Sequence, residues 1–364
     1  MSLHIVTIIG ARPQFIKAAV VSRAVGKYNS KIRETIIHTG QHYDDNMSSL
    51  FFHQLDIPEP NFNLGIGSGS HGQMTGQMII ALEKAMIDLN PDVVLVYGDT
   101  NSTLAGALAA SKHHFPVAHV EAGLRSYNKR MPEEQNRVLT DHLSSFLFCP
   151  TATAKQNLAK ESIVDGVDVC GDVMLDASLY YRRNLGEKSS IRTDLNVDDQ
   201  RYALVTCHRE ENTNSSSRFE NIMAAIARIS ASMTVVFPAH PRISKSVHSA
   251  LKAHGNHNVI LTDPVGYFEM MDLQLHADAV LTDSGGVQKE AYFLRVPCLT
   301  MRDETEWIET LDSGANTLVG ANTDTIIGQF RKVVDNPLDV ECNSHAFGRG
   351  DAAERILDVL LDKH

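Results

Sequence analysis

The sequence has few cysteines, no paired metal-binding motif and only one tryptophan. Its cysteines are scattered, odd in number and never spaced as a CxxC pair, and they number five: Cys149, Cys170, Cys207, Cys298 and Cys342. This pattern argues against a disulfide framework and against a zinc site. The 17 histidines show no HExxH or comparable ligand spacing. We therefore expect buried free thiols, no metal and a cytoplasmic protein.

Long apolar runs and excess positive charge are also missing. No stretch approaches the roughly 18 uninterrupted apolar residues of a membrane helix, and no charged-then-apolar signal segment precedes the first predicted strand. A net charge of -11 opposes nucleic-acid binding. It leaves room for an anionic small molecule, because a local group of arginines and helix N-termini can bind phosphate in an acidic protein. A length of 364 residues indicates about two domains.

Short β-branched runs alternate with helical stretches, which predicts a parallel, doubly wound α/β sheet. The first series of strands is His4–Ile9, Ile36–Gly40, Val93–Tyr97, Val117–Val120 and Leu147–Cys149, and the predicted helices between them include Gly76–Leu89 and Thr103–His113. The second series is Tyr202–Thr206, Thr234–Phe237, Val259–Leu261, Ala279–Leu281 and Cys298–Thr300, before a final amphipathic helix at Ala352–Leu361.

The two series predict two Rossmann-like domains, at residues 1–172 and 173–349. The charged stretch 180–199 has the composition of a connector. Tandem sheets of this kind imply an interdomain cleft, with ligands at the carboxyl ends of the strands.

One strand-to-helix turn has the composition of a phosphate loop. Ser284, Gly285 and Gly286 lie between a buried strand and a helix start. The glycines allow close backbone approach, and the helix N-terminus favours phosphate. Glu290, about one turn into the helix, is placed to accept from the hydroxyls of a ribose. An ordinary turn with an N-cap serine is the alternative interpretation.

Three carboxylates follow strands or open a helix in the first domain. Asp99 and Glu121 come directly after apolar strands, and Glu133 lies at a helix start beside Pro132. N-capping and the helix dipole are alternative explanations for Asp99 and Glu133. If the three converge, their mutual repulsion suits a general acid and base near neutral pH.

Cations accompany these carboxylates. Arg12 and Lys17 follow the first strand at a helix entrance, and Arg137 lies one turn beyond Glu133. They predict binding of an anionic group, while solvated surface cations are the alternative.

In the second domain, His208 and Arg209 follow a strand and suit a diphosphate or a proton transfer. His240, between two prolines, is a candidate ligand contact. Tyr267 and Phe268 suit either a base-stacking aromatic or the core.

Seven motifs in this order carry a resemblance to a known family: GARPQFIK, TGQHYD, YGDTNSTLA, HVEAGLRS, MPEEQNRVLTDH, CHREEN and LTDSGGVQKEA. The chain resembles the non-hydrolysing UDP-N-acetylglucosamine 2-epimerases over nearly its whole length. The resemblance implies a glycosyltransferase-B type fold, with the C-terminal helix at about 350–364 packed back on the first domain. It also implies a homodimer that inverts C2 of a UDP-hexosamine without a cofactor, by eliminating and re-adding UDP through a glycal, for cell-surface polysaccharide such as O-antigen.

The resemblance also implies roles for the candidate residues. The acid and base candidates, with His208 as a further catalytic candidate, are Asp99, Glu121, Glu133 and His208. The residues expected to bind phosphate, sugar or UDP are Arg12, Lys17, Arg137, Arg209, His240, Tyr267, Ser284, Gly285, Gly286 and Glu290. Which carboxylate takes the proton is left open.

The sequence departs from the best-known members after Met301-Arg302-Asp303. They usually continue T-T-E-R-P-E, whereas this chain has Trp307 in place of the arginine. This pattern resembles a branch that acts on UDP-2,3-diacetamido-2,3-dideoxyglucuronate, so two substrates remain open. The rival functions are a hydrolysing epimerase, a glycosyltransferase of the same fold and a UDP-sugar-binding regulator without activity.

Overall fold

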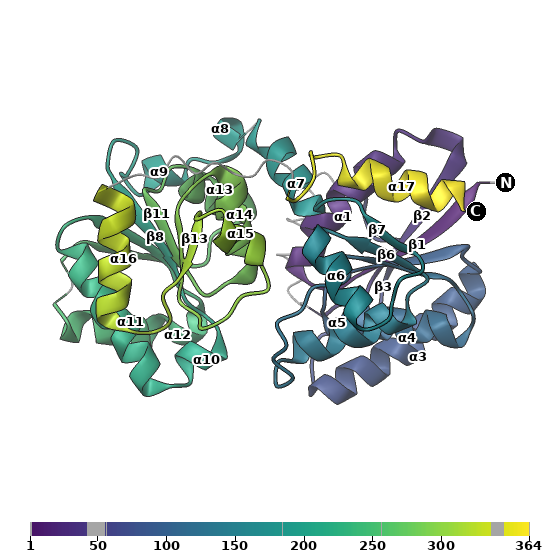
Figure 1. Ribbon diagram of the computed structural model, residues 1–364, viewed down its shortest axis with the longest axis horizontal. Helices are drawn as coiled ribbons and strands as arrows, with labels where there is room; N and C mark the ends of the chain where they lie inside the picture. The colour runs from purple at the N-terminus through teal and green to yellow at the C-terminus, as the bar shows by residue number, and fades with distance from the viewer. Residues whose placement is uncertain are drawn as a thin grey trace. The chain divides into compact units, whose positions relative to one another are not determined.

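The computed structural model describes residues 2–41, 55, 57–183, 185–255, 257–335 and 346–363. The chain forms two compact units, one made of residues 1–177 with 345–364 and the other of residues 178–344 (Figure 1). The division falls within α7 (Val173–Arg182), a few residues after the boundary predicted at 172. Part of the TGQHYD motif and Cys342 lie outside the described residues.

The first unit is built on a parallel sheet with the strand order β3-β2-β1-β4-β5-β6-β7. These strands are β1 (Leu3–Ile9), β2 (Ile32–His38), β3 (Phe62–Asn63), β4 (Val93–Tyr97), β5 (Val117–Val120), β6 (Phe146–Cys149) and β7 (Val167–Val169). Ile8 of β1 pairs with Ile37 of β2 on one side and Val96 of β4 on the other. The strand order reverses direction between β1 and β4, and ligands bind at such switch points in open α/β sheets.

Helices cover both faces of this sheet, so its central strands are apolar throughout. All five residues of β4 are buried, and Met78, Leu82 and Met86 pack on one face. The helices of the unit are α1 (Arg12–Val25), α3 (His71–Leu89), α4 (Asn101–Lys112), α5 (Pro132–Leu143), α6 (Ala152–Lys160) and α17 (Ala352–Asp362), with a 3-10 turn η1 (Asn29–Lys31).

The second unit repeats the design with the strand order β10-β9-β8-β11-β12-β13, and its switch point lies between β8 and β11. The strands are β8 (Tyr202–Thr206), β9 (Thr234–Pro238), β10 (Val259–Thr262), β11 (Ala279–Thr282), β12 (Cys298–Thr300) and β13 (Asn316–Leu318). The helices are α8 (Leu185–Lys188), α9 (Ile191–Asp194), α10 (Glu210–Thr213), α11 (Ser216–Ser230), α12 (Pro241–Ala253), α13 (Tyr267–Leu275), α14 (Gly285–Leu294), α15 (Ile308–Asp312) and α16 (Thr323–Asp335).

The predicted α/β class is confirmed, and the predicted strands agree with the structure to within a few residues. The stretch 180–199, predicted to be a connector, is instead part of the second unit's packed structure, because it contains α8 and α9, which pack against α13. Leu185 and Val197 are buried there. Scattered apolar residues in a charged stretch therefore built two short helices that composition alone did not reveal.

The C-terminal helix α17 belongs to the first unit and contacts α1 (Figure 1). Lys27 forms an ion pair with Glu354, and the Tyr28 hydroxyl donates to Asp358 at 2.7 Å. At the N-terminus of α17, the Ala353 N–H donates to the Asp176 carboxylate at 2.8 Å. These contacts join α17 to two segments of the first unit that lie far from it in the sequence.

Asp176 predicts a pH-dependent contribution to stability. Burial raises the pKa of this carboxyl from 3.8 to about 6, against the lowering effect of the Ala353 and Ala352 N–H groups. Between these two values the folded state holds a proton that the unfolded state has released, so stability falls as pH rises through this window. In Asp176→Asn we expect that step to disappear and the variant to be more stable above pH 6 by about 1–3 kcal/mol.

Thermal unfolding followed by circular dichroism from pH 4.5 to 8 measures this difference. Glu354→Gln, a change on the exposed side of the same helix, is the matched control and should follow the wild-type pH dependence. Parallel curves for Asp176→Asn and the wild type would contradict the assignment.

In the described part of the chain no helix is long and apolar enough to cross a membrane. Cys149, Cys170, Cys207 and Cys298 are all buried free thiols. Burial raises the pKa of Cys149 and of Cys298 to about 12, so these thiols are unreactive in the folded protein.

Candidate functional sites in the two units

The loops at the switch point of the first sheet are tied together by Gln14. Its side-chain oxygen accepts from the Gly10 and Ala11 N–H groups at 2.8 and 3.0 Å. Its amide nitrogen donates to the carbonyl of Tyr97 and to the Thr103 hydroxyl, both at 2.9 Å. Gln14 is buried, so the loop after β1 is fixed against the loop after β4. This role of Gln14 was not predicted from the sequence.

Glu121 and Lys17 form an ion pair at this edge of the sheet. Their side chains are only 5% and 11% exposed, so water screens the pair weakly. The pair lies against Gly98, where an added Cβ would come within 3.2 Å of both charged groups. Gly98 also has a φ of +63°, so the position before Asp99 requires glycine on both grounds. Arg12, the first residue of α1, lies on the same helix as Lys17.

Glu121 has an unusual backbone for a residue with a side chain, with a φ of +70°. Its N–H and that of Ala122 both donate to the carbonyl of Phe148 on the neighbouring strand, each at 3.1 Å. Non-glycine residues seldom adopt this conformation, and it persists where surrounding contacts enforce it, often at functional sites. The left-handed backbone of Glu121 therefore supports a functional interpretation over a solvated surface charge.

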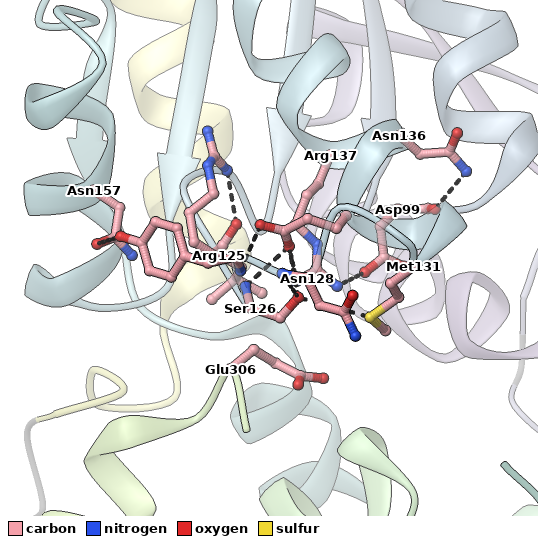
Figure 2. Close-up of polar contacts among 12 residues, drawn as sticks. Asp99, Arg125, Ser126, Asn128, Met131, Asn136, Arg137, Asn157 and Glu306 are labelled. Atoms are coloured by element: carbon pink, nitrogen blue, oxygen red, sulfur yellow. Dashed lines mark hydrogen bonds and ion pairs between the residues drawn. The ribbon is translucent and has the colours of Figure 1, made fainter. Parts of the chain in front are cut away.

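Asp99 is held by two residues of α5. Arg137 forms an ion pair with its carboxylate, and the side-chain amide of Asn136 donates to its backbone carbonyl at 2.9 Å (Figure 2). Asn136 also donates to Asn101 at 3.2 Å. Thr100, rather than Asp99, provides the N-cap of α4, so the capping explanation for Asp99 is wrong.

Of the two adjacent glutamates at the start of α5, Glu134 lies in this network. Its carboxylate accepts from the Ser126 and Tyr127 N–H groups at 2.9 and 2.8 Å and pairs with Arg137 at 3.1 Å. Glu133 is half-buried, and among the described residues no hydrogen bond or ion pair joins it to Asp99 or Glu121. Successive side chains of a helix point in different directions, so only one of the two glutamates can face this network. The sequence alone did not indicate which one.

Asp141 is a fully buried carboxylate that the sequence analysis missed. It accepts from the Gly123 N–H at 3.1 Å, from Arg125 at 2.7 Å and from the His119 ring at 2.7 Å. Arg125 also forms two hydrogen bonds with Glu161, at 2.7 and 2.8 Å. Asp141 therefore holds the loop that begins at Glu121. A charged residue at a core-facing helical position was the available signal.

Asp283 has the same function in the second unit. This buried carboxylate accepts from the N–H groups of His208 and Arg209, at 3.1 and 3.0 Å, and from the Asn212 side chain at 3.1 Å. The loop after β8 is thereby fastened to the end of β11, across the switch point. Asp283 lies within the LTDSGGVQKEA motif, but its role was not predicted from the sequence.

His208 has a half-exposed side chain whose Nδ1 lies 3.4 Å from Asp283. Desolvation lowers the pKa of His208, Asp283 opposes this effect, and the positive charges of Arg209 and Arg242 add to the lowering. The neutral ring at pH 7 can accept a proton, as a catalytic base must.

The predicted phosphate turn opens α14. Ser284 is the N-cap, but its side chain makes no capping hydrogen bond. Among the described residues no acceptor bonds the N–H groups of Gly285 and Gly286, so both remain available to an anion, and the Glu306 carboxylate lies against Gly285. An added Cβ on Gly285 would collide with the Glu306 side chain, and it would lie 3.4 Å from Trp307.

Glu290 lies one turn into α14 and is 8% exposed. The fully buried Gln274 of α13 donates to it at 2.8 Å, which fixes the direction of its carboxylate. On the same helix, the buried ammonium of Lys289 lies 4.1 Å from the centre of the Trp307 ring, a cation–π contact.

Two predicted ligand residues have structural contacts of their own. His240 is the exposed N-cap of α12 and accepts from the Arg242 N–H at 3.2 Å. Tyr267 is 3% exposed and packs edge-on against Tyr181 and Phe268. This packing favours the core interpretation of Tyr267 over base stacking, and ligand roles for both residues stay predictions.

No group of histidine, cysteine, aspartate and glutamate side chains among the described residues is arranged to hold a metal ion.

Comparison with known proteins gives consistent results over the whole chain. The family model described as UDP-N-acetylglucosamine 2-epimerase matches residues 25–361. A UDP-N-acetylglucosamine 2-epimerase homolog of Methanococcus maripaludis is 49% identical, over 98% of this chain and 99% of the relative. The UDP-2,3-diacetamido-2,3-dideoxy-D-glucuronate 2-epimerase of Pseudomonas aeruginosa is 47% identical, with the same coverage.

A solved structure is similarly close. The UDP-GlcNAc 2-epimerase of Methanocaldococcus jannaschii, crystallised with UDP-GlcNAc and UDP, superposes with a TM-score of 0.87 at 43% identity. The match covers 99% of both chains.

Proposed function

This chain belongs to the UDP-N-acetylglucosamine 2-epimerase family, and from that premise we propose that it inverts C2 of a UDP-sugar without hydrolysing it. The substrate is UDP-N-acetylglucosamine or its 2,3-diacetamido-glucuronate derivative, converted from the gluco to the manno form for polysaccharide synthesis. The enzyme acts as a cytoplasmic homodimer, and buried free cysteines suit a reducing compartment.

The reaction is an elimination followed by an addition. A base removes the proton from C2, the C2–H electron pair forms the C1–C2 double bond, and the C1–O bond to UDP breaks. UDP leaves as an anion and a glycal remains. A proton is then delivered to C2 from the opposite face while UDP re-adds to C1, so no net oxidation occurs and no cofactor is required.

The first unit supplies the proton transfers in this proposal. Glu121 is the favoured base, because a neighbouring ammonium stabilises the ionised carboxylate and the geometry presents it at the switch point. Asp99 and Glu133 are the remaining acid and base candidates. Arg137 orients Asp99 through their ion pair. Arg12 and Lys17 place positive charge beside the sugar and phosphate.

The second unit holds the leaving group. The open N–H groups of Gly285 and Gly286, with Ser284, bind the diphosphate, and Glu290 accepts from the ribose hydroxyls. Arg209 stabilises the departing charge, and the neutral His208 ring is available for a proton transfer. His240 and Tyr267 complete the proposed UDP contacts.

The conformation and surroundings of Glu121 carry this proposal. This residue combines a strained backbone, a buried ion pair and a position directly after β5. A residue needed only for packing would not require this combination.

Solvent exchange at C2 tests the reaction. In D2O we expect deuterium at C2 of the substrate and of its epimer, because proton abstraction at C2 precedes re-addition of UDP. The two candidate sugars are incubated separately and followed by proton NMR. Absence of exchange with both would overturn the proposal.

The same spectra separate the rival functions. Stoichiometric free sugar and UDP identify a hydrolysing epimerase. Turnover that appears only when an acceptor is added identifies a glycosyltransferase. Binding without exchange identifies a regulator.

The comparison of rates for the two sugars assigns the substrate. Trp307, which contacts Lys289 and lies beside the phosphate turn, stands in place of the usual arginine, and this departure favours the uronate. A higher kcat/KM for the uronate is the expected result.

A further inference from the structure

His119 of β5 is a buried titratable residue to which the proposed reaction assigns no role. Its side chain is 0% exposed. Nε2 lies 2.7 Å from the carbonyl oxygen of Gly98, and Nδ1 lies 2.7 Å from the carboxylate of Asp141. Both ring nitrogens therefore face an acceptor.

A backbone carbonyl can only accept a hydrogen bond. Asp141 is also in its accepting form, because its carboxylate receives the Gly123 N–H and the Arg125 guanidinium. Burial alone would raise the pKa of Asp141, but the hydrogen bonds and charges of His119 and Arg125 outweigh it and hold the pKa below its usual value. A neutral imidazole has a single N–H and can satisfy only one of the two acceptors.

The ring connects the two loops that carry the proposed acid and base. Gly98 immediately precedes Asp99, and His119 lies two residues before Glu121. Asp141 lies on α5 one turn beyond Arg137, which pairs with Asp99. A closed circuit therefore runs from Asp99 through Arg137, α5, Asp141 and His119 to the Gly98 carbonyl.

The circuit reaches Glu121 as well. The Glu121 carboxylate and the Lys17 ammonium lie against Gly98, the residue whose carbonyl His119 holds. A peptide plane that rotated at Gly98 would move Asp99, the next residue, and would change the backbone surface against which the Glu121 carboxylate lies.

We propose that His119 is a positioning residue of this enzyme, a buried imidazolium that donates to Gly98 and Asp141 and so fixes Asp99 and Glu121 relative to each other. This role rests on the proposed epimerase reaction. The Asp141 carboxylate stabilises the charged ring. A buried ion pair is stable only when the two charges are close and all their hydrogen bonds are satisfied, and both conditions hold here.

The protonation state is tested first, and without any assay of activity. Protein labelled with 15N-histidine is compared with His119→Gln to identify the His119 signals in the NMR spectrum. We expect both ring nitrogens of His119 to carry a proton at pH 7.5. A ring with one unprotonated nitrogen overturns the imidazolium.

Kinetics test the positioning role. In His119→Phe we expect kcat for C2 exchange to fall about 10- to 100-fold, the range set by a displaced catalytic group. The Kd for UDP should stay within about twofold, because the phosphate turn and Glu290, its main proposed contacts, belong to the second unit. A wild-type kcat in folded His119→Phe overturns the role.

Two further variants complete the design. His119→Asn keeps one donor and serves if the phenylalanine variant does not fold; it should recover part of the lost kcat. His113→Ala removes a half-buried histidine that pairs with Glu83, away from the proposed site, and should behave as the wild type. If the wild type itself shows no exchange, the proposed function fails, whereas the NMR result still decides the state of His119.

Discussion

Glu121→Gln is expected to lower kcat for C2 exchange by about 100- to 10,000-fold, the contribution of a positioned general base. Glutamine has nearly the same volume and can still accept a hydrogen bond from Lys17, but it cannot remove a proton. UDP should bind the variant as tightly as the wild type, because the phosphate turn and Glu290, its main proposed contacts, lie in the second unit. Deuterium incorporation gives kcat, and calorimetric titration with UDP gives the affinity.

Two comparisons sharpen this result. Asp99→Asn tests the partner acid, and a loss of similar size would indicate that the two carboxylates act as one unit, since such effects are not additive. Glu83→Gln changes a half-exposed surface carboxylate and should leave turnover unchanged. A collapse of UDP affinity in Glu121→Gln would make Glu121 a structural residue.

Arg125→Met is expected to destabilise the first unit by about 3–5 kcal/mol, the usual consequence of removing one partner of a buried charge pair. The Arg125 side chain is 1% exposed and bonds Asp141, Glu161 and the Leu124 carbonyl. Methionine fills much of the same space but leaves the Asp141 carboxylate with less compensation. The Asp141 carboxylate is fully buried, so its negative charge destabilises the folded state when Arg125 no longer compensates it.

The chain offers an internal reporter for this experiment. The single tryptophan, Trp307, lies in the second unit, so its fluorescence follows that unit while circular dichroism follows both. In urea we expect the dichroism midpoint to fall in Arg125→Met. Arg228→Met removes an exposed arginine and should change stability by less than about 0.5 kcal/mol. An unchanged dichroism midpoint in Arg125→Met would contradict the assignment.

Sequence reasoning was strongest where one local signal sufficed. Continuous apolar runs such as Val93–Tyr97 predicted the central strands, because a strand covered on both faces needs no polar alternation. Asp99 and Glu121 were predicted as candidates for a related reason. They directly follow such strands, and the ends of parallel strands meet at one edge of the sheet.

The residues that hold the sites in place were harder to predict. Asp141 meets His119 and Arg125 from 22 and 16 positions away in the sequence, and its role exists only once α5 has packed on the sheet. Asp283 was visible within a motif, but its partners come from the loop after β8. A carboxylate that organises a distant loop looks the same in sequence as one that caps a helix.

The fastening of α17 to α1 has a consequence for how the chain acquires its fold during synthesis. Asp172 and Phe347 are hydrogen-bonded to each other within the first unit, so the whole second unit is an insertion between neighbouring points. The ribosome releases α17 after every residue of the insertion. The unit that carries Asp99 and Glu121 cannot complete its core until α17 has emerged. The nucleotide-binding unit has by then emerged entirely, so it is free to fold first.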